Sequence, residues 1–143
     1  GMTAVDLGAA PGGWTWQLTR HSIRVTAIDN AALDHRLEET GLVCHRRADG
    51  FRYRPPAPVD WLVCDMVEQP RRIAALVVDW LAAGDCRQAL FNLKLPMRRR
   101  LEEIDHCRDL IDRRLGRSGV RYRLSCKQLY HDRREVTALL QRL

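Results

Sequence analysis

Short apolar runs alternate with amphipathic segments along the chain, and turn-forming or charged residues separate them. This pattern predicts buried strands over residues 3–7, 24–29, 60–65 and 89–94, with a weaker strand over residues 42–46. Two more strands are expected near the C-terminal end, joined by a polar turn at 130–134, and they span residues 121–129 and 135–143.

Apolar side chains spaced three and four residues apart predict two long amphipathic helices in the second half of the chain. The first helix has its apolar stripe at Ile73, Leu76, Val77, Trp80 and Leu81. The second begins near Arg98, is expected to be broken by Gly116 and Gly119, and has its stripe at Leu101, Ile104, Ile111 and Leu115. A further helix is expected from about Trp14.

This alternation predicts an α/β fold with a mostly parallel sheet, covered on both faces and closed by a C-terminal antiparallel hairpin. In such sheets, ligands bind outside the carboxyl ends of the strands. Polar features fall at that edge in succession: the loop at Gly8, then Asp29, Asp65 and Lys94. Each of them alone could be an ordinary turn residue or cap. A binding site is predicted because polar residues occur at the ends of several successive strands.

The composition fits one soluble domain and narrows the functional classes. The 143 residues suit a single domain, and 45% hydrophobic residues are enough to build a core rather than a disordered chain. No apolar run approaches the roughly 20 residues that span a bilayer, so no membrane partner is expected. The five cysteines form no CxxC pair, which predicts reduced thiols in a cytoplasmic protein and no metal site.

The net charge of +6 is concentrated in the second half of the chain. Residues 71–143 carry 17 basic and 9 acidic side chains, which suggests a polyanionic partner such as nucleic acid. Solvated helix faces explain the same charges equally well. Of the 24 basic residues, only Lys94 and Lys127 are lysines. In a chain that otherwise uses arginine, these two positions are candidates for a function that requires an amine.

The most informative segment is residues 6–14, DLGAAPGGW, which follows the first strand and opens a helix. Small residues let the backbone approach a ligand, and the helix N-terminus favours an anionic group. The glycines lack the GxGxxG spacing of dinucleotide sites. Asp29, after the second strand, suits two ribose hydroxyls. Together these features describe a nucleoside cofactor with a carboxylate and no pyrophosphate, and S-adenosylmethionine fits that description.

The DLGAAPGGW string closely resembles the first motif of the FtsJ-type ribose 2′-O-methyltransferases. The other motifs of that family follow in order at residues 28–29, 48–50, 64–66, 92–94 and 135–137. Segments 93–99 and 127–133 are most similar to a branch that modifies a cytidine ribose in large-subunit ribosomal RNA. The resemblance implies a Rossmann-like class I fold that uses S-adenosylmethionine.

The resemblance also implies roles for individual residues. Ala10, Pro11, Gly12 and Gly13 correspond to the methionine end of the cofactor, Asp29 to the ribose, Asp49 to the adenine and Asp65 to the reacting methyl. Gly8 and Trp14 complete this cofactor set. In the family's catalytic Lys-Asp-Lys-Glu set, the last three members correspond to Asp65, Lys94 and Glu135. The first lysine normally lies upstream of the glycine loop, and no lysine precedes Lys94 here.

The implied reaction moves a methyl group from a sulfonium to a ribose 2′-hydroxyl, which must lose its proton to become a good nucleophile. Lys94 would accept that proton and must therefore be neutral at that moment. Burial and a second cation lower a lysine pKa, whereas neighbouring carboxylates such as Asp65 and Glu135 raise it. Each residue also has a non-catalytic interpretation. In that interpretation, Lys94 simply extends its aliphatic chain from the strand end so that the ammonium group reaches water. Glu135 is then an ordinary solvated charge at the start of a strand.

Two groups of surface candidates remain open at this point. Arg98, Arg99 and Arg100 follow the Lys94 strand at the same edge and are candidates for phosphate contacts, or equally an exposed first helical turn. Asp49 precedes Gly50 and also suits an ordinary turn. The four tryptophans are expected to pack in the core or against the cofactor loop rather than to stack on bases.

Competing functions are a methyltransferase that modifies a base and a non-catalytic RNA- or cofactor-binding domain. The first is disfavoured because residues 65–68 lack the Asp/Asn-Pro-Pro-aromatic run and no cysteine follows Pro or Thr. The absent first lysine favours the second. We instead expect residues 1–143 to be a monomeric catalytic domain that lacks its N-terminal part, from a longer protein whose upstream region recognises ribosomal RNA.

Overall fold

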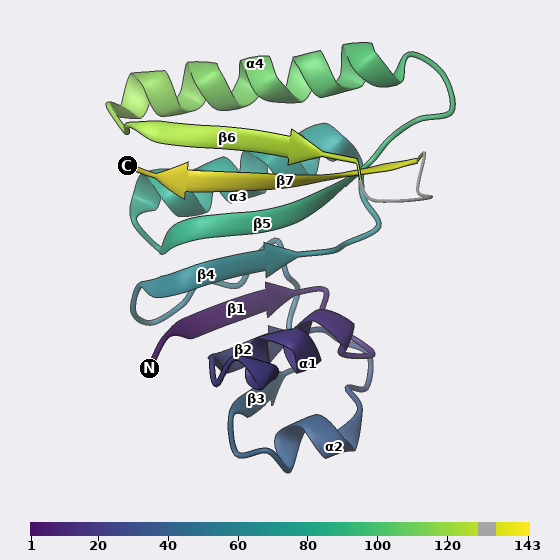
Figure 1. Cartoon of the computed structure of the whole chain (residues 1–143), viewed down its shortest axis with the longest axis vertical. Coiled ribbons are helices and arrows are strands. Elements are labelled where there is room, and N and C mark those ends of the chain that lie inside the picture. Colours follow the sequence, from purple (N-terminus) through teal and green to yellow (C-terminus); the bar gives the residue numbers. More distant parts are fainter. Residues whose placement is uncertain (129–133) are drawn as a thin grey trace.

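The computed structural model describes residues 1–128 and 134–143. Within these residues, seven strands form one sheet in the order β3-β2-β1-β4-β5-β7-β6 (Figure 1). The strands are β1 (Thr3–Leu7), β2 (Arg24–Ile28), β3 (Val43–Arg46), β4 (Val59–Cys64), β5 (Cys86–Lys94), β6 (Tyr122–Lys127) and β7 (Glu135–Arg142). β1 to β5 are parallel, and β7 is antiparallel to both β5 and β6. The mostly parallel sheet with a C-terminal antiparallel hairpin is therefore confirmed.

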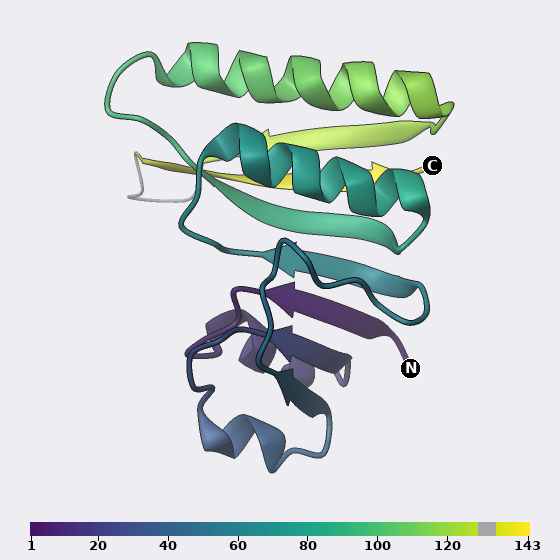
Figure 2. The ribbon, with the colours of Figure 1, turned by 180° about the vertical axis from the view of Figure 1, so that it is seen from behind.

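Helices cover both faces of the sheet, but over different halves. The helices are α1 (Gly13–Arg20), α2 (His35–Glu38), α3 (Pro70–Ala83) and α4 (Arg100–Ser118). α1 lies over β1 and β2 on one face, whereas α3 lies behind β5 and β7 on the other, as the front and back views show (Figures 1 and 2). α4 packs beside α3 and runs along β6.

The core lies between α3 and the sheet. The predicted stripe of α3 is buried, and it packs with alternate residues of β5, namely Ala89, Phe91 and Leu93. The opposite set of β5 positions contains Asn92 and Lys94, and the strand pairing places these beside Thr137 and Glu135 of β7. The two-residue period of a strand thus holds apolar side chains in the core and directs polar ones to the other face.

The structure corrects the sequence prediction for α4. Leu101 is 78% exposed rather than buried, and the buried stripe runs through Cys107, Ile111 and Leu115. Two residues after Leu101, Glu103 pairs with Arg71 in the first turn of α3. Gly116 lies within the helix and does not break it, because a glycine in a helix interior costs only about 1 kcal/mol relative to alanine.

Other boundaries differ by a few residues. Gly119 caps α4 in the left-handed conformation, at φ 69°, as a C-terminal glycine commonly does. β5 begins three residues earlier than expected, and α2 was not predicted because four residues are too few to show a helical period. Residues 129–133, which hold most of the predicted turn and part of the 127–133 motif, lie outside the described residues. No described helix is long and apolar enough to cross a membrane.

Candidate active site

The loop between β1 and α1 forms one side of the site. Gly8 has φ +73°, and a Cβ atom there would lie 2.5 Å from Cγ of Met66. Only glycine combines this conformation with so close an approach. The Gly8 N–H donates to the Ile28 carbonyl at 2.9 Å, and the Ala10 N–H donates to Asp29 Oδ2 at 2.9 Å. Asp29 Oδ1 accepts a second bond, 2.9 Å from the N–H of Ala31. Asp29 thus anchors the loop to the end of β2.

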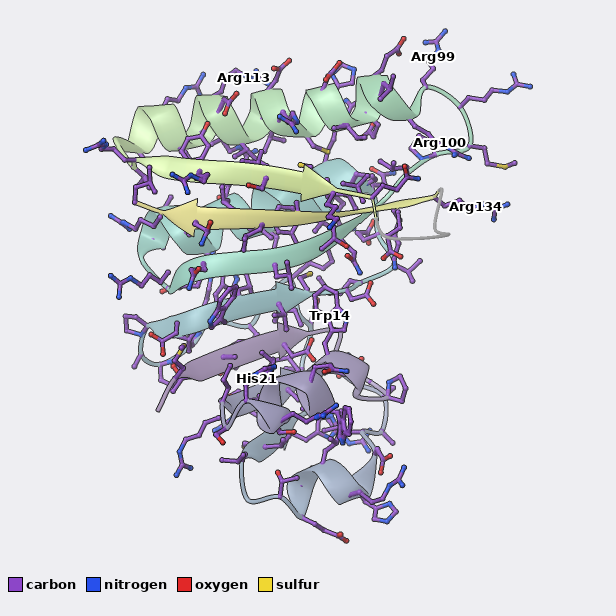
Figure 3. All side chains as sticks on the ribbon, in the orientation of Figure 1. Trp14, His21, Arg99, Arg100, Arg113 and Arg134 are labelled. Carbon is purple, nitrogen blue, oxygen red and sulfur yellow. The ribbon has the colours of Figure 1, made fainter. Side chains whose placement is uncertain are left out.

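A hollow of about 350 Å³ opens at the carboxyl ends of β1, β2 and β4. It gathers five of the residues that the sequence assigned to a cofactor, namely Gly8, Ala10, Asp29, Asp49 and Asp65. Pro11, Gly12 and Gly13 instead line a second hollow of about 470 Å³, together with Trp16 and Leu37. Trp14 is half-buried near the carboxyl ends of β1 and β4 (Figure 3). The glycine loop therefore separates the predicted cofactor residues into two neighbouring groups.

Asp49 also has a local structural role. Its Oδ1 accepts the N–H of Phe51 at 2.9 Å, and its carbonyl oxygen accepts the N–H groups of Arg52 and Tyr53. These bonds form the turn expected of an Asp-Gly pair. Because a carboxylate oxygen has two lone pairs, the turn still leaves Asp49 able to accept a further bond at the rim of the hollow.

Asp6 is a buried carboxyl group beneath the loop. Thr15 Oγ1 donates to its Oδ2 at 2.7 Å. Burial is the main cause that raises the pKa of Asp6 to about 7, and the nearby charges of Asp65 and Asp29 act in the same direction. Three carboxyl groups thus converge at the start of the loop, and their field favours a cationic ligand. No role for Asp6 was predicted from the sequence. Its place inside an apolar strand was the feature that could have indicated a buried carboxyl group.

The second side of the site is a cluster around Lys94, the last residue of β5. Lys94 Nζ donates to Asp65 Oδ1 at 2.8 Å and to Glu135 Oε1 at 2.6 Å. Asp65 follows β4, and Glu135 lies opposite Lys94 in the β5–β7 ladder. Because Asp65 also lines the 350 Å³ hollow, the ammonium group lies beside it. The three residues expected to be catalytic are thus neighbours in space.

Asn92 supports this cluster from inside the sheet. It is buried, its Nδ2 donates to Asp65 Oδ1 at 3.2 Å, and its Oδ1 accepts from Thr137 Oγ1 at 2.7 Å. These bonds hold the Asp65 carboxylate toward Lys94. Asn92 and Thr137 were part of the recognised motifs, but no role was predicted for them, because the function of each depends on strand pairing.

The profile of the FtsJ-like methyltransferase family matches residues 1–111 of the chain. The chain belongs to the FtsJ-like methyltransferase family. Relatives named "Ribosomal RNA large subunit methyltransferase M" include proteins of Methylococcus capsulatus, 66% identical over 99% of this chain, and of Azoarcus sp., 62% identical over 98%. The match covers 40% and 38% of those relatives, so the chain spans about two fifths of their length.

Solved structures show the same fold at low sequence identity. The fibrillarin pre-rRNA processing protein of Methanococcus jannaschii matches this FtsJ-like methyltransferase with a TM-score of 0.72 at 14% identity. The match covers 99% of this chain and 66% of the fibrillarin chain. The predicted Rossmann-like class I methyltransferase fold is confirmed by this likeness.

The protonation of Lys94 is set by opposing effects in this FtsJ-like methyltransferase. Desolvation is the largest single effect and lowers the pKa of Lys94, but the hydrogen bonds and charges of Asp65 and Glu135 together outweigh it. The pKa of Lys94 is therefore raised above its ordinary value. In this arrangement Lys94 is an ammonium group that donates two hydrogen bonds, and it must lose a proton before it can accept one.

The predicted arginine run lies at the same edge of the sheet. Arg98 and Arg99 are exposed in the connection after β5, and Arg100 begins α4 with its Nε donating to the Pro96 carbonyl at 3.2 Å (Figure 3). Arg134, just before β7, projects at this edge as well and was not among the predicted residues. The described residues contain no group of His, Cys, Asp and Glu side chains able to hold a metal ion.

Proposed function

We propose that this chain is the catalytic domain of an S-adenosylmethionine-dependent methyltransferase that methylates a ribose 2′-hydroxyl in RNA. The observation that carries the proposal is the Lys94 ammonium group, bonded to both Asp65 and Glu135 beside the glycine-loop hollow. A lysine in that position combines a general base with two carboxylates that fix its direction.

The chain's own residues suit the cofactor. When bound, S-adenosylmethionine supplies a methyl group on a positively charged sulfur. Asp29 and Asp49 line the hollow where hydroxyl and amine donors of an adenosine would lie, and their oxygens retain lone pairs. The negative charges of Asp29 and Asp65, which also act on the buried Asp6, favour the positive charge. Gly12 and Gly13, at the start of α1, suit the carboxylate of the methionine end.

In the proposed reaction, neutral Lys94 Nζ takes the proton of the 2′-hydroxyl as its oxygen forms a bond to the methyl carbon. The methyl donor would balance this step, because its sulfur would keep the electron pair of the carbon–sulfur bond. Asp65 and Glu135 stabilise the ammonium group that results, and Asn92 keeps Asp65 in place. Alignment of oxygen, carbon and sulfur supplies much of the acceleration.

The names of the relatives support ribosomal RNA of the large subunit as the substrate. The resemblance of segments 93–99 and 127–133 to the cytidine-modifying branch supports a cytidine. We place RNA recognition in both the Arg98–Arg99–Arg100 run and the part of a longer protein outside residues 1–143. The five cysteines are free in the structure, in keeping with the proposed cytoplasmic location. We propose that the protein acts as a monomer.

Ribose-methylation mapping tests this function. Unmodified large-subunit ribosomal RNA is incubated with S-adenosylmethionine and the complete gene product that contains this chain. We expect a 2′-O-methyl group at one cytidine, absent in reactions without the protein. A methyl group on a base, or cofactor binding with no methylated RNA, would contradict the proposal. The latter result would favour the non-catalytic binding domain.

A further inference from the structure

A third hollow is lined by Lys94 and shares Val67 with the 350 Å³ hollow. It measures about 500 Å³ and is framed by two segments: residues 67–71, which lead into α3, and residues 94–96, which follow β5. Glu103 of α4 closes its wall. Val67 lines both hollows, so the two are adjacent, and Lys94 lies where they meet. We call the third hollow the acceptor pocket.

We propose that the acceptor pocket holds the target nucleoside, a pyrimidine turned out of its RNA strand, and that Gln69 and Arg71 select it. The inference rests on the proposed function, because it requires an RNA acceptor. Sequence-specific recognition of RNA mostly targets unstacked bases in loops and bulges, which side chains can contact on their faces and edges. A volume of about 500 Å³ lies within the usual range for small-molecule sites, roughly 300–1,000 Å³.

The lining of the pocket matches the chemistry of a nucleoside. Val67, Leu95 and Pro96 offer apolar surface to the plane of a base. The side-chain amide of Gln69 is exposed and carries both a donor and an acceptor, so it can pair with the polar edge of a base. Its carbonyl oxygen suits the exocyclic amine of cytosine. Because Lys94 also lines the pocket, the ribose attached to such a base would lie beside Lys94.

Exposed apolar side chains gather around the same place. Among the described residues, six large apolar side chains are exposed, and three of them belong to the segments beside the pocket: Val67, Met97 and Leu101. Val67 is 93% exposed although it lies between the two hollows. Exposed apolar side chains can pack against unstacked bases, whereas a surface that contacts only water has no need of them.

The wall of the pocket is fixed by a two-pronged ion pair. Arg71 Nε donates to Glu103 Oε1 at 3.1 Å, and Arg71 Nη2 donates to Glu103 Oε2 at 3.2 Å. The Glu103 side chain is 16% exposed, whereas Arg71 is 54% exposed. Arg71 is thus oriented by a largely covered partner and remains accessible to an RNA oxygen. The pair joins α3 to α4, so the pocket has a firm wall.

A matched ion pair on the same helices makes the test specific. Asp79 of α3 pairs with Arg114 of α4 at 3.7 Å, and neither residue lines the acceptor pocket as the structure describes it. Arg71→Gln and Asp79→Asn each remove one ion pair between α3 and α4. A structural role predicts similar effects of the two substitutions, whereas the proposed role predicts an effect on RNA from Arg71→Gln alone.

The experiment measures steady-state methylation of the target RNA by the complete gene product, with the cofactor Kd and the Tm of each variant. We expect Arg71→Gln and Gln69→Ala to raise the KM for RNA at least about tenfold, with the cofactor Kd unchanged. Asp79→Asn should leave the KM for RNA unchanged. Arg71→Lys serves as a second variant, because lysine keeps the positive charge but cannot donate two parallel hydrogen bonds as a guanidinium group does. It should raise the KM for RNA to an intermediate value.

Base selection gives an independent readout. An RNA with uridine at the target position should be methylated at least about tenfold less efficiently than the cytidine RNA, and Gln69→Ala should reduce that ratio. Equal KM values for Arg71→Gln and Asp79→Asn, or an unchanged ratio in Gln69→Ala, would overturn the assignment of the pocket. A wild-type protein that methylates no RNA would instead refute the proposed function, so the two failures are distinguishable.

Discussion

Burial and neighbouring negative charges together raise the pKa of one residue at the site, Asp6. Asp6 is held under the glycine loop, where burial first and the charges of Asp29 and Asp65 second raise its pKa to about 7. In an unfolded chain, the pKa of Asp6 would return to its ordinary value of 3.8. Between these values the folded protein binds more protons than the unfolded chain. The contribution of Asp6 to the free energy of unfolding is therefore fully present below pH 4, and it is lost as the pH rises toward 7.

Asp6→Asn is expected to remove this pH dependence. The asparagine oxygen can still accept the bond from Thr15, but it carries no charge at any pH. Thermal unfolding between pH 4.5 and pH 8 should show a smaller fall in Tm for Asp6→Asn than for wild type. Asp105→Asn, at an exposed position of α4, is the control and should retain the wild-type slope. Parallel Tm curves for all three proteins would contradict the role of Asp6.

At the scale of elements, the sequence predicts what depends on local patterning. The α3 stripe and the strands that end before Asp29 and Asp65 follow from apolar periodicity. Lys94 and Glu135 could be named from motifs, but their contact depends on the antiparallel register of β5 and β7. Leu101 fits the apolar period of α4, yet its side chain is exposed. Its exposure therefore depends on how the helices are placed, which periodicity does not encode.

A pair of substitutions in α4 tests this corrected packing. Ile111 is buried against the core, and Ile111→Ala should lower the free energy of unfolding by about 2–5 kcal/mol through lost burial and a cavity. Leu101→Ala should change it by less than about 0.5 kcal/mol, as expected for an exposed position. Chemical denaturation measures both values. Similar losses in the two variants would place Leu101 in the core, as the sequence alone predicted.

For the whole molecule, the distribution of charge matters more than the net value of +6. Arg99, Arg100 and Arg134 lie at the carboxyl edge of the sheet, the edge that holds Lys94 (Figure 3). Arg98 is the exposed residue just before Arg99. The carboxylates of Glu135 and Asp65 at that edge form ion pairs with Lys94. An RNA backbone that approaches Lys94 therefore meets arginines there. This grouping depends on the fold, because Arg134 is far from the other three in the sequence.

RNA affinity should therefore fall steeply with salt, because neutralised phosphates release counterions. Arg99→Gln should weaken binding and reduce the slope of log K against log salt by about 0.7, the value for one single-stranded phosphate contact. Arg24→Gln is the control, since Arg24 begins β2 at the opposite edge of the sheet and is also exposed. Filter binding over a salt series measures both. An identical slope for the two variants would assign Arg99 to the solvated surface.

The account depends most directly on the identity of the proton acceptor. Lys94→Arg keeps the positive charge beside Asp65 and Glu135, but arginine does not deprotonate in proteins. The decisive measurement is single-turnover methyl transfer by the complete gene product, with the cofactor Kd measured in parallel. We predict that Lys94→Arg slows transfer at least about a hundredfold, as loss of a general base does, and leaves the cofactor Kd within about twofold. Transfer at the wild-type rate would contradict the central claim.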